Sequence, residues 1–398
     1  MKQMRDNASG VRERIVTQKE KMEKMNGRRL REQIEVRWQE GRYNEIKSLL
    51  LQYKEITERD NDLATVCYLC TIFEQEKEAG QMTLFEKVSG MEELLERYTI
   101  LKFYLRRIEY DVMDGQMEEF YHFLLQNQIS QYELLRVLDF SVVKKDKVLR
   151  CIKAGEEKIG KAYSQKEGQE RKKPEQGKPE KGICFILCTN NRLYAQECLY
   201  YIHHLKIPDG YWIDVLTVEE AESMTSGYQE AMEYSAAKYK IYLHQDTFII
   251  YLDFLEVCLN LFRQNSQIGM IGNVGVRNMP KSGVMWDADR FGMLYEQHIY
   301  ETELLINRIE TKTQADYLAV EAVDGFLMVT QYDVTWRKDL FDKWDFYDCS
   351  QSMEFIRHGY QVVVPRMDSP WCVHDCGFIN LSRYEEERQK FVKEYLEK

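Results

Sequence analysis

One segment without large apolar side chains divides this sequence into two parts of different character. Residues 164–182 consist only of Ser, Gln, Lys, Glu, Gly, Arg and Pro. Such a segment buries too little apolar surface to offset the entropy that ordering would cost, so we predict a flexible charged linker over residues 156–181. We therefore expect a helical module over residues 1–155 and a second domain over residues 182–398.

The composition is that of a globular protein and excludes some functions. The 398 residues are 44% hydrophobic, but the net charge is −11, and phosphate binding needs a basic surface. A nucleic-acid partner is therefore disfavoured. No apolar run is long enough to span a bilayer, and the charged N-terminus lacks the apolar region of a secretory signal. We expect a cytoplasmic protein without a transmembrane segment, whose ten cysteines are reduced.

The first part has the composition of an all-helical module. Proline is absent up to residue 160, and Leu, Glu, Lys, Arg and Gln dominate. Amphipathic helical segments are expected over residues 31–53, 63–79, 91–113, 117–126 and 131–159. Trp38, Gly41 and Tyr43 weakly resemble part of a tetratricopeptide hairpin, without a second copy at a fixed period. A helical-hairpin module could be a scaffold, bind a protein partner or self-associate, and the sequence leaves these roles open.

The second part alternates short apolar runs with helical segments. Strands are expected over residues 183–187, 212–218 and 240–243, and helices over residues 194–205 and 228–237. This alternation predicts an α/β fold with a mostly parallel sheet between helices. Ligands of such sheets collect at the carboxyl ends of the strands, so the residues there become candidates for binding and chemistry.

Polar side chains follow each of these three strands. They are Thr189, Asn190 and Asn191, then Glu219, then His244, Gln245 and Asp246. An imidazole and a carboxylate two residues apart beside a turn can meet one divalent cation, or a metal bound to a diphosphate. Considered alone, such groups are more often ordinary hydrogen-bonded turns than ligand sites.

Longer motifs around the third strand resemble a known family. Residues 224–246, MTSGYQEAMEYSAAKYKIYLHQD, resemble the donor-binding stretch of family-2-type glycosyltransferases, in which a Ser-Gly-like turn opens a helix and a strand ends in Asp-x-Asp. Residues 265–275, NSQIGMIGNVG, with Pro280 and Trp286 after them, resemble the branch of bacterial glycosyltransferase-like proteins that includes the streptomycin-biosynthesis type. The resemblance covers about residues 182–377. It implies a GT-A-like fold, a UDP-linked nucleotide-sugar donor and bound Mn²⁺ or Mg²⁺.

The resemblance also implies roles for the residues at the strand ends. Asp246, together with His244 and His374, would hold the metal, and His244 would also contact the donor. His244 stands where the family has the first Asp of Asp-x-Asp, and its imidazole brings no negative charge. The implied donor-binding residues are Thr189, Asn190, Asn191, Glu219, Gly227, His244 and Gln245.

A second motif that resembles this family lies near the C-terminus. Tyr347 and Asp348 precede a helical segment that ends at Gly359 and Tyr360, before an expected strand over residues 361–365. Inverting members of the family carry Glu-Asp at the start of such a helix and Gly-Tyr at its end, so the resemblance implies Asp348 as general base. The helix dipole would hold this carboxylate charged and oriented, although the same position suits an ordinary N-cap. Tyr347 departs from the family's Glu.

Two further positions have alternatives of their own. The resemblance implies that Asp324, at the end of an expected strand, helps hold the acceptor or the donor sugar; a turn Asp is the alternative. His374 lies in the segment WCVHDCG, residues 371–377, where the family often supplies a late histidine to the metal. A buried structural histidine is one alternative. A zinc site with Cys372 and Cys376 is the other, and it lacks an evident fourth ligand.

We therefore expect an inverting, metal-assisted glycosyltransferase that transfers a sugar to a hydroxyl of a glycan or another acceptor. The alternative is a helical scaffold or interaction protein whose transferase-like domain binds nucleotide sugars with weak or no catalysis. His244 and Tyr347, the two departures from the family pattern, keep this alternative open. A nucleotidyltransferase is disfavoured because no glycine-rich basic loop follows the first strand.

Overall fold

The computed structural model describes residues 26–78, 88–113, 116–127, 129, 134, 144–159, 178–297, 302–307, 315–377, 381 and 383–397. The chain divides into two compact units. One is Met1–Tyr163 with Gly377–Asn380, and the other is Ser164–Cys376 with Leu381–Lys398. The predicted linker lies mostly outside the described residues. Within the described ranges, no helix is both long and apolar enough to cross a membrane.

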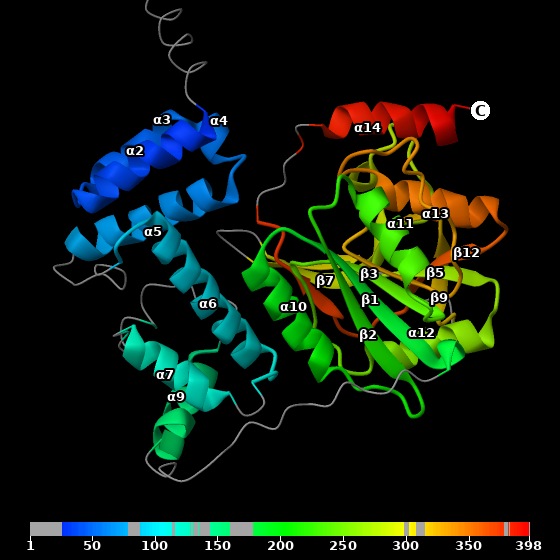
Figure 1. Ribbon diagram of the computed structural model, residues 1–398, viewed down its shortest axis with the longest axis horizontal. Coiled ribbons are helices and arrows are strands. Elements are labelled where there is room, and N and C mark those ends of the chain that lie inside the picture. The colour runs from blue at the N-terminus through cyan, green and yellow to red at the C-terminus, as the bar shows by residue number, and fades with distance from the viewer. Residues whose placement is uncertain are drawn as a thin grey trace, which may run out of the picture. The chain divides into compact units, whose positions relative to one another are not determined.

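The first unit is helical throughout its described part, as the sequence predicts (Figure 1). Its helices are α2 (Gly27–Gln39), α3 (Tyr43–Gln52), α4 (Lys54–Thr57), α5 (Asn61–Glu78), α6 (Met91–Glu109), α7 (Met117–Gln126) and α9 (Lys145–Ile159). Their inward faces share one hydrophobic core. In that core the Trp38 indole N–H donates to the Val88 carbonyl over 3.0 Å, so the largest side chain also has its polar atom satisfied.

Two of the predicted helices are not continuous in the structure. The segment expected as one helix over residues 31–53 is two helices, because the chain turns after α2 at Gly41, whose φ is +67°. That conformation costs glycine little and other residues more, and it ends α2 in the usual way. Helix α9 begins at Lys145 after the non-helical Lys144, so the range expected from residue 131 is not one continuous helix; of residues 131–143 only Leu134 is described, and it is helical. Helix α9 reaches Ile159, within the range that the sequence assigns to the linker.

The second unit is built on a mixed seven-stranded sheet in the order β2-β1-β3-β11-β5-β12-β9. Five strands run in one direction: β1 (Gly182–Thr189), β2 (Trp212–Glu219), β3 (Tyr239–His244), β5 (Ile268–Gly272) and β12 (Gln361–Pro365). Two run the opposite way: β9 (Tyr317–Val320) and β11 (Leu327–Thr330). The mostly parallel α/β sheet expected from the sequence is therefore present.

Helices cover both faces of this sheet. They are α10 (Arg192–His204), α11 (Met224–Tyr234), α12 (Phe254–Gln264) and α13 (Tyr347–Arg357). Strands β2 and β3 flank β1 on opposite sides, so right-handed connections place α10 and α11 on opposite faces. Cys184, Ile186 and Cys188 of β1 share one buried cluster with side chains of α11 and α13. The face that packs on α11 therefore also receives the start of α13.

Helix α11 starts four residues earlier than the sequence suggested, because a capping box sets its first turn. The Ser223 hydroxyl accepts from the Ser226 N–H at 3.1 Å, and the Ser226 hydroxyl accepts from the Ser223 N–H at 3.0 Å. This exchange satisfies two donors that a helix start would otherwise leave unpaired. The predicted range over residues 228–237 is therefore wrong at both ends.

A second sheet, which the sequence did not predict, joins distant segments in the order β10-β6-β7-β13-β4, with β8 paired to β7. Its strands are β4 (Thr247–Ile249), β6 (Val274–Val276), β7 (Arg290–Gln297), β8 (Thr302–Asn307), β10 (Ala322–Val323) and β13 (Cys372–His374). The remaining helical elements are α14 (Tyr384–Phe391) and the short turns η1 (Pro179–Lys181), η2 (Met285–Asp287) and η3 (Val392–Leu396). Because β13 lies between β4 and β7, the end of the chain returns to the turn that follows β3.

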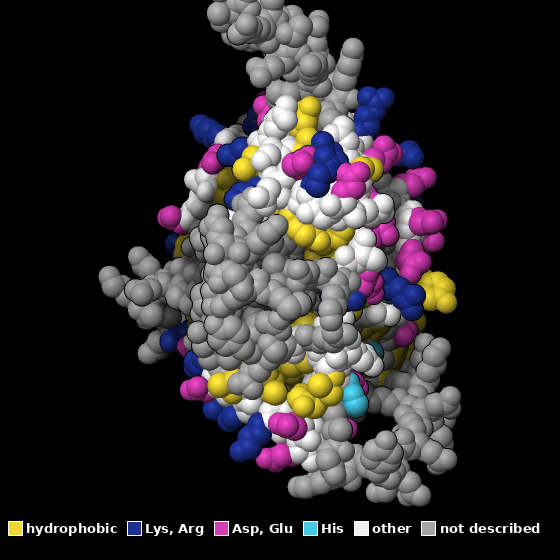
Figure 2. Space-filling view, turned by 90° about the vertical axis from the view of Figure 1, so that its left-hand side faces the viewer, with side chains coloured by type: hydrophobic (Ala, Val, Ile, Leu, Met, Phe, Trp, Pro, Cys, Tyr) yellow, Lys and Arg dark blue, Asp and Glu magenta, His cyan; other side chains and the backbone are white. Residues whose placement is uncertain are grey.

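The described surface carries charges of both signs. On the face drawn in Figure 2, Lys and Arg side chains are interspersed with Asp and Glu. The described atoms of this face therefore form no continuous basic area of the kind that nucleic-acid binding requires.

Candidate functional site

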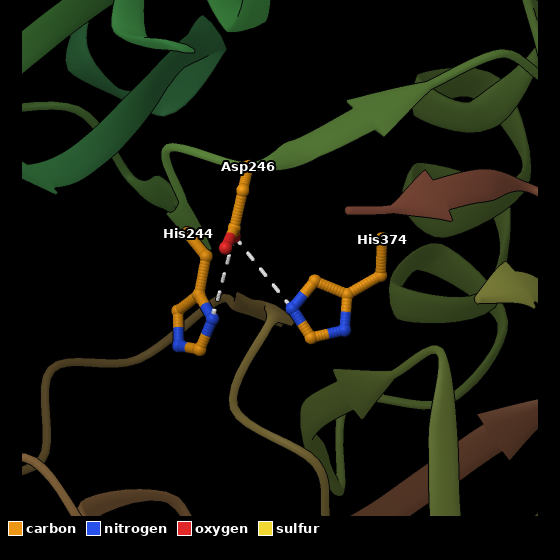
Figure 3. A group of neighbouring side chains, drawn as sticks. All are labelled: His244, Asp246 and His374. Carbon is orange, nitrogen blue, oxygen red and sulfur yellow. Dashed lines mark ion pairs between the residues drawn. The ribbon is translucent and has the colours of Figure 1, made fainter. Parts of the chain in front are cut away.

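Three side chains with metal-binding atoms converge at the end of β3. His244 is the last residue of β3, Asp246 lies in the turn before β4, and His374 is the last residue of β13. Oδ1 of Asp246 lies 3.8 Å from Nδ1 of His244 and 3.6 Å from Nε2 of His374. Figure 3 shows the carboxylate between the two imidazole rings, and the three ligand atoms all lie within 4.8 Å of one another. The structure thus brings together the three residues that the sequence proposed for a metal; we call them the HDH group.

Strand pairing explains how His374 reaches this place. In the antiparallel pairing of β13 with β4, His374 is opposite Thr247. The Asp375 N–H then donates to the Asp246 carbonyl oxygen over 2.9 Å. The backbone of the late strand is therefore fixed against the turn that carries Asp246.

The side chains of the HDH group fit a divalent cation. Burial lowers the pKa of His244 to about 4, with the nearby Asp246 carboxylate opposing that shift and His374 adding to it. The imidazole is therefore neutral at pH 7, and its lone pair is available to a metal. One carboxylate and two imidazoles suit Mn²⁺ better than Mg²⁺, which prefers oxygen ligands.

Gln245 ties the loop after β1 to the turn after β3. Its Oε1 accepts from the Thr189 hydroxyl at 2.7 Å and from the backbone N–H groups of Asn190 and Asn191 at 3.1 and 2.9 Å. Its Nε2 donates to Oδ1 of Asn190 over 2.6 Å. Four of the residues proposed for donor binding thus form one hydrogen-bonded unit at the carboxyl edge of the sheet.

Two of the proposed donor-binding residues also have clear structural tasks. The Asn191 side chain caps α10, where Oδ1 accepts from the N–H groups of Leu193 and Tyr194 at 3.1 and 3.3 Å. Gly227 lies inside α11, and a Cβ atom there would come within 2.7 Å of Sγ of Cys188. This glycine allows α11 to approach β1. Its position is thus accounted for by packing.

Glu219 lies at the same edge of the sheet. It is the last residue of β2 and is in register with Thr189 of β1, and its side chain is exposed. It is therefore placed beside the Gln245 unit and is open to a ligand.

Asp348 lies in the first turn of α13, and its carboxylate is held by two backbone donors. Oδ2 accepts from the Gly325 N–H at 2.9 Å, and Oδ1 accepts from the Cys349 N–H at 2.7 Å. The N-cap of α13 is Phe346, so the alternative of Asp348 as an ordinary N-cap does not describe its position. Burial and, after it, the Asp324 carboxylate raise the pKa of Asp348 to about 7, although the backbone donors oppose the shift.

Asp324 links this carboxylate to the HDH group. Asp324 follows β10, and burial raises its pKa, while His374 lowers it. The Phe326 ring, two residues later, stacks on the His374 imidazole with the ring centroids 4.9 Å apart. Residues 324–326 therefore contact both parts of the site: Gly325 binds Asp348, and Phe326 packs on His374.

Tyr347 is a site residue whose contact the sequence did not reveal. Its hydroxyl is hydrogen-bonded to Nε2 of His244, on the opposite side of the ring from the nitrogen that faces Asp246. Its ring also lies so close to Gly325 that a Cβ atom there would come within 2.1 Å of the hydroxyl oxygen. In the sequence, Tyr347 was marked only by its position directly before Asp348, where the family has Glu; nothing in the sequence indicated its contact with His244.

These features first define a class of protein. A mostly parallel α/β sheet carries a group that could hold a divalent cation and a loop of hydrogen-bonding side chains at its strand ends, with the half-buried Asp348 carboxylate beside them. This arrangement is that of an α/β domain that binds its ligands at the carboxyl ends of the sheet strands. The particular family follows from the sequence: the profile of the glycosyltransferase like family matches residues 184–395, and the chain belongs to that family.

Other comparisons give more distant similarities. No curated protein matches the sequence. Among solved structures, the chain is similar to GalNAc-T7 with UDP, GalNAc and Mn²⁺ at 8% identity and a TM-score of 0.36, covering 51% of this chain and 45% of that one. It is similar to the mannosyltransferase PcManGT from Pyrobaculum calidifontis, in complex with GDP-Man and Mn²⁺, at 11% identity and a TM-score of 0.34. This match covers 53% of this chain and 63% of that one. S. aureus TarS matches at 13% identity and a TM-score of 0.34, and the match covers 53% of this chain and 39% of that one. The chain thus spans less than two thirds of each of these proteins.

Proposed function

We propose that the second unit is an inverting glycosyltransferase. It moves a sugar from a nucleotide-sugar donor, UDP-linked, to a hydroxyl of a glycan or another acceptor. The observation that carries the proposal is the position of Asp348, whose carboxylate is half-buried beside Asp324 and has a pKa of about 7. Direct displacement at the anomeric carbon needs a base for the acceptor proton, and a base works best with a pKa near the working pH.

The positions of the side chains support the remaining roles in this proposal. Asp246, His244 and His374 hold Mn²⁺ or Mg²⁺, with Mn²⁺ favoured by the two imidazoles. When bound, the cation neutralises charge on the leaving nucleoside diphosphate. The donor nucleotide binds at the unit formed by Thr189, Asn190, Asn191 and Gln245, with Glu219 beside it, and Asp324 orients the sugar or the acceptor. A place in the streptomycin-biosynthesis branch and a cytoplasmic location belong to the same proposal.

One observation favours a second candidate function. His244 is neutral where a second carboxylate would attract the cation more strongly. The rival is therefore a domain that binds nucleotide sugars without turning them over, carried by the helical first unit as a scaffold. It predicts donor binding by the wild type in the absence of transfer.

Release of UDP separates the two functions. A panel of UDP-sugars is offered to the wild type with Mn²⁺, and then to Asp348→Asn. We expect turnover by the wild type and a loss of about 10²–10⁴-fold in Asp348→Asn, because the base contributes a factor of that size. The matched control is Asp342→Asn, since Asp342 is exposed and pairs with Lys343 and Lys390 at the surface. If Asp348→Asn released UDP as fast as the wild type, Asp348 would not be the base. If the wild type bound the donor without turning it over, the rival function would be favoured.

A further inference from the structure

His374 belongs to two groups of ligand atoms, of which the HDH group is one. The other consists of Glu296, His374 and Cys376, whose ligand atoms also lie within 4.8 Å of one another. Sγ of Cys376 is 3.8 Å from Oε1 of Glu296. All three side chains are partly exposed, so a cation can reach them. We call them the EHC group.

The backbone explains why these three residues meet. In the parallel pairing of β13 with β7, His374 is in register with Glu296, and paired residues lie on the same face of a sheet. Cys376 follows His374 by two residues, the spacing that returns an extended chain to the same face. Two chain segments therefore supply a carboxylate, an imidazole and a thiol to one place.

The zinc alternative drawn from the sequence named a different set. Cys372 is fully buried within β13 and is in neither group of potential ligands among the described residues. The third potential ligand beside His374 and Cys376 is instead Glu296, which is distant from them in the sequence. The structure thus places Glu296, rather than Cys372, close to His374 and Cys376.

The two groups differ in the metal that they suit. Zinc is bound by thiolate, imidazole and carboxylate, and a site with three protein ligands leaves a fourth position for water. Sulfur ligands select zinc over Mn²⁺ and Mg²⁺. The HDH group has no sulfur atom, whereas the EHC group has one. A thiophilic cation should therefore prefer the EHC group.

We propose that Glu296, His374 and Cys376 form a zinc site that competes with the HDH group for His374. A neutral imidazole has one lone pair, so it can ligate one cation at a time. Zinc would bind with release of the Cys376 thiol proton to solvent and would take His374 from Asp246. Zinc binding stands by itself, whereas the consequence that zinc inhibits sugar transfer rests on the proposed function.

Cobalt is the probe for the site, because a thiolate bound to Co²⁺ gives a charge-transfer absorption in the near ultraviolet. Metal-free full-length protein is titrated with Co²⁺, and then with Zn²⁺. We expect one equivalent of the absorption in the wild type, its displacement by Zn²⁺, and its loss in Cys376→Ser. The matched control is Cys151→Ser, because Cys151 and Cys376 are the two partly exposed cysteines and the other eight are buried. Absence of the band in the wild type, or its survival in Cys376→Ser, would overturn the zinc site.

Inhibition tests the shared histidine. Zn²⁺ is added to the Mn²⁺-supported reaction of the wild type, of Cys376→Ser and of Glu296→Gln, which keeps the thiol. We expect the zinc concentration for half-inhibition to rise at least about tenfold in both variants, because each loses a zinc ligand. Equal inhibition of all three proteins would refute the competition for His374. A wild type that gives the cobalt band but no transfer would refute the proposed function and leave the zinc site standing.

Discussion

At the scale of single residues, Tyr347 and Asp348 reach two different parts of the site from one helical turn. Tyr347 binds His244 of the HDH group, and Asp348 binds the Gly325 N–H. A hydrogen bond to the far nitrogen of an imidazole fixes the orientation of the ring and the nitrogen that carries the proton. We therefore expect Tyr347 to position His244 for the proposed metal.

Tyr347→Phe should weaken Mn²⁺ binding about tenfold, since the loss of a partner that orients a metal ligand typically costs 10- to 100-fold in affinity. Calorimetric titration of Mn²⁺ measures the effect. Tyr332→Phe is the control, because its hydroxyl donates to the Ser266 carbonyl over 2.9 Å and is not part of the HDH group. Equal Mn²⁺ affinity in Tyr347→Phe and the wild type would contradict the positioning role.

The pair of carboxylates predicts a pH dependence. Asp348 can accept a proton only when it is ionised, so kcat/KM should rise with pH as this carboxyl, with a pKa of about 7, loses its proton. The Asp324 charge raises that pKa, and removing it in Asp324→Asn should move the rise to lower pH. The profiles of both proteins are compared at one Mn²⁺ concentration. A rise that stays in place or moves to higher pH would contradict the coupling.

At the scale of elements, the sequence predicted what local patterns determine. The apolar run of β1 and the Gly359-Tyr360 end of α13 marked the elements near their observed bounds. The pairing of β13 with β4 and β7 could not be predicted in this way, because it joins strands that are distant in the sequence. His374 was therefore found through the family resemblance, and Glu296 was missed.

The cap of α10 gives a prediction at this scale. Asn191→Ala removes the side-chain oxygen that accepts from the Leu193 and Tyr194 N–H groups, and should lower the free energy of unfolding by about 1 kcal/mol. Asn191→Asp keeps an acceptor oxygen and should retain wild-type stability. Denaturant unfolding measures both variants. An Asn191→Ala protein as stable as the wild type would show that the cap contributes nothing.

At the scale of the whole molecule, the chain consists of two compact units, each with its own core. The linker that the sequence predicts between them remains a prediction, as does the role of the helical unit. All residues assigned to the HDH group, to donor binding and to catalysis lie in the second unit.

A chain of residues 178–398 should therefore fold by itself and bind UDP with Mn²⁺ as tightly as the full protein. Its unfolding in denaturant should be a single cooperative transition, because the core of the second unit is retained. A fragment that folds but loses Mn²⁺-dependent UDP binding would show that the first unit contributes to the donor site.

The central claim is that the HDH group holds the donor through a metal and that Asp348 removes the acceptor proton. Donor affinity and kcat, measured side by side for Asp246→Asn and Asp348→Asn, test it most directly. We predict that Asp246→Asn loses Mn²⁺-dependent donor binding, whereas Asp348→Asn binds the donor normally and loses about 10²–10⁴-fold in kcat. Wild-type kcat in Asp348→Asn, or Mn²⁺-dependent donor binding unchanged in Asp246→Asn, would contradict the account.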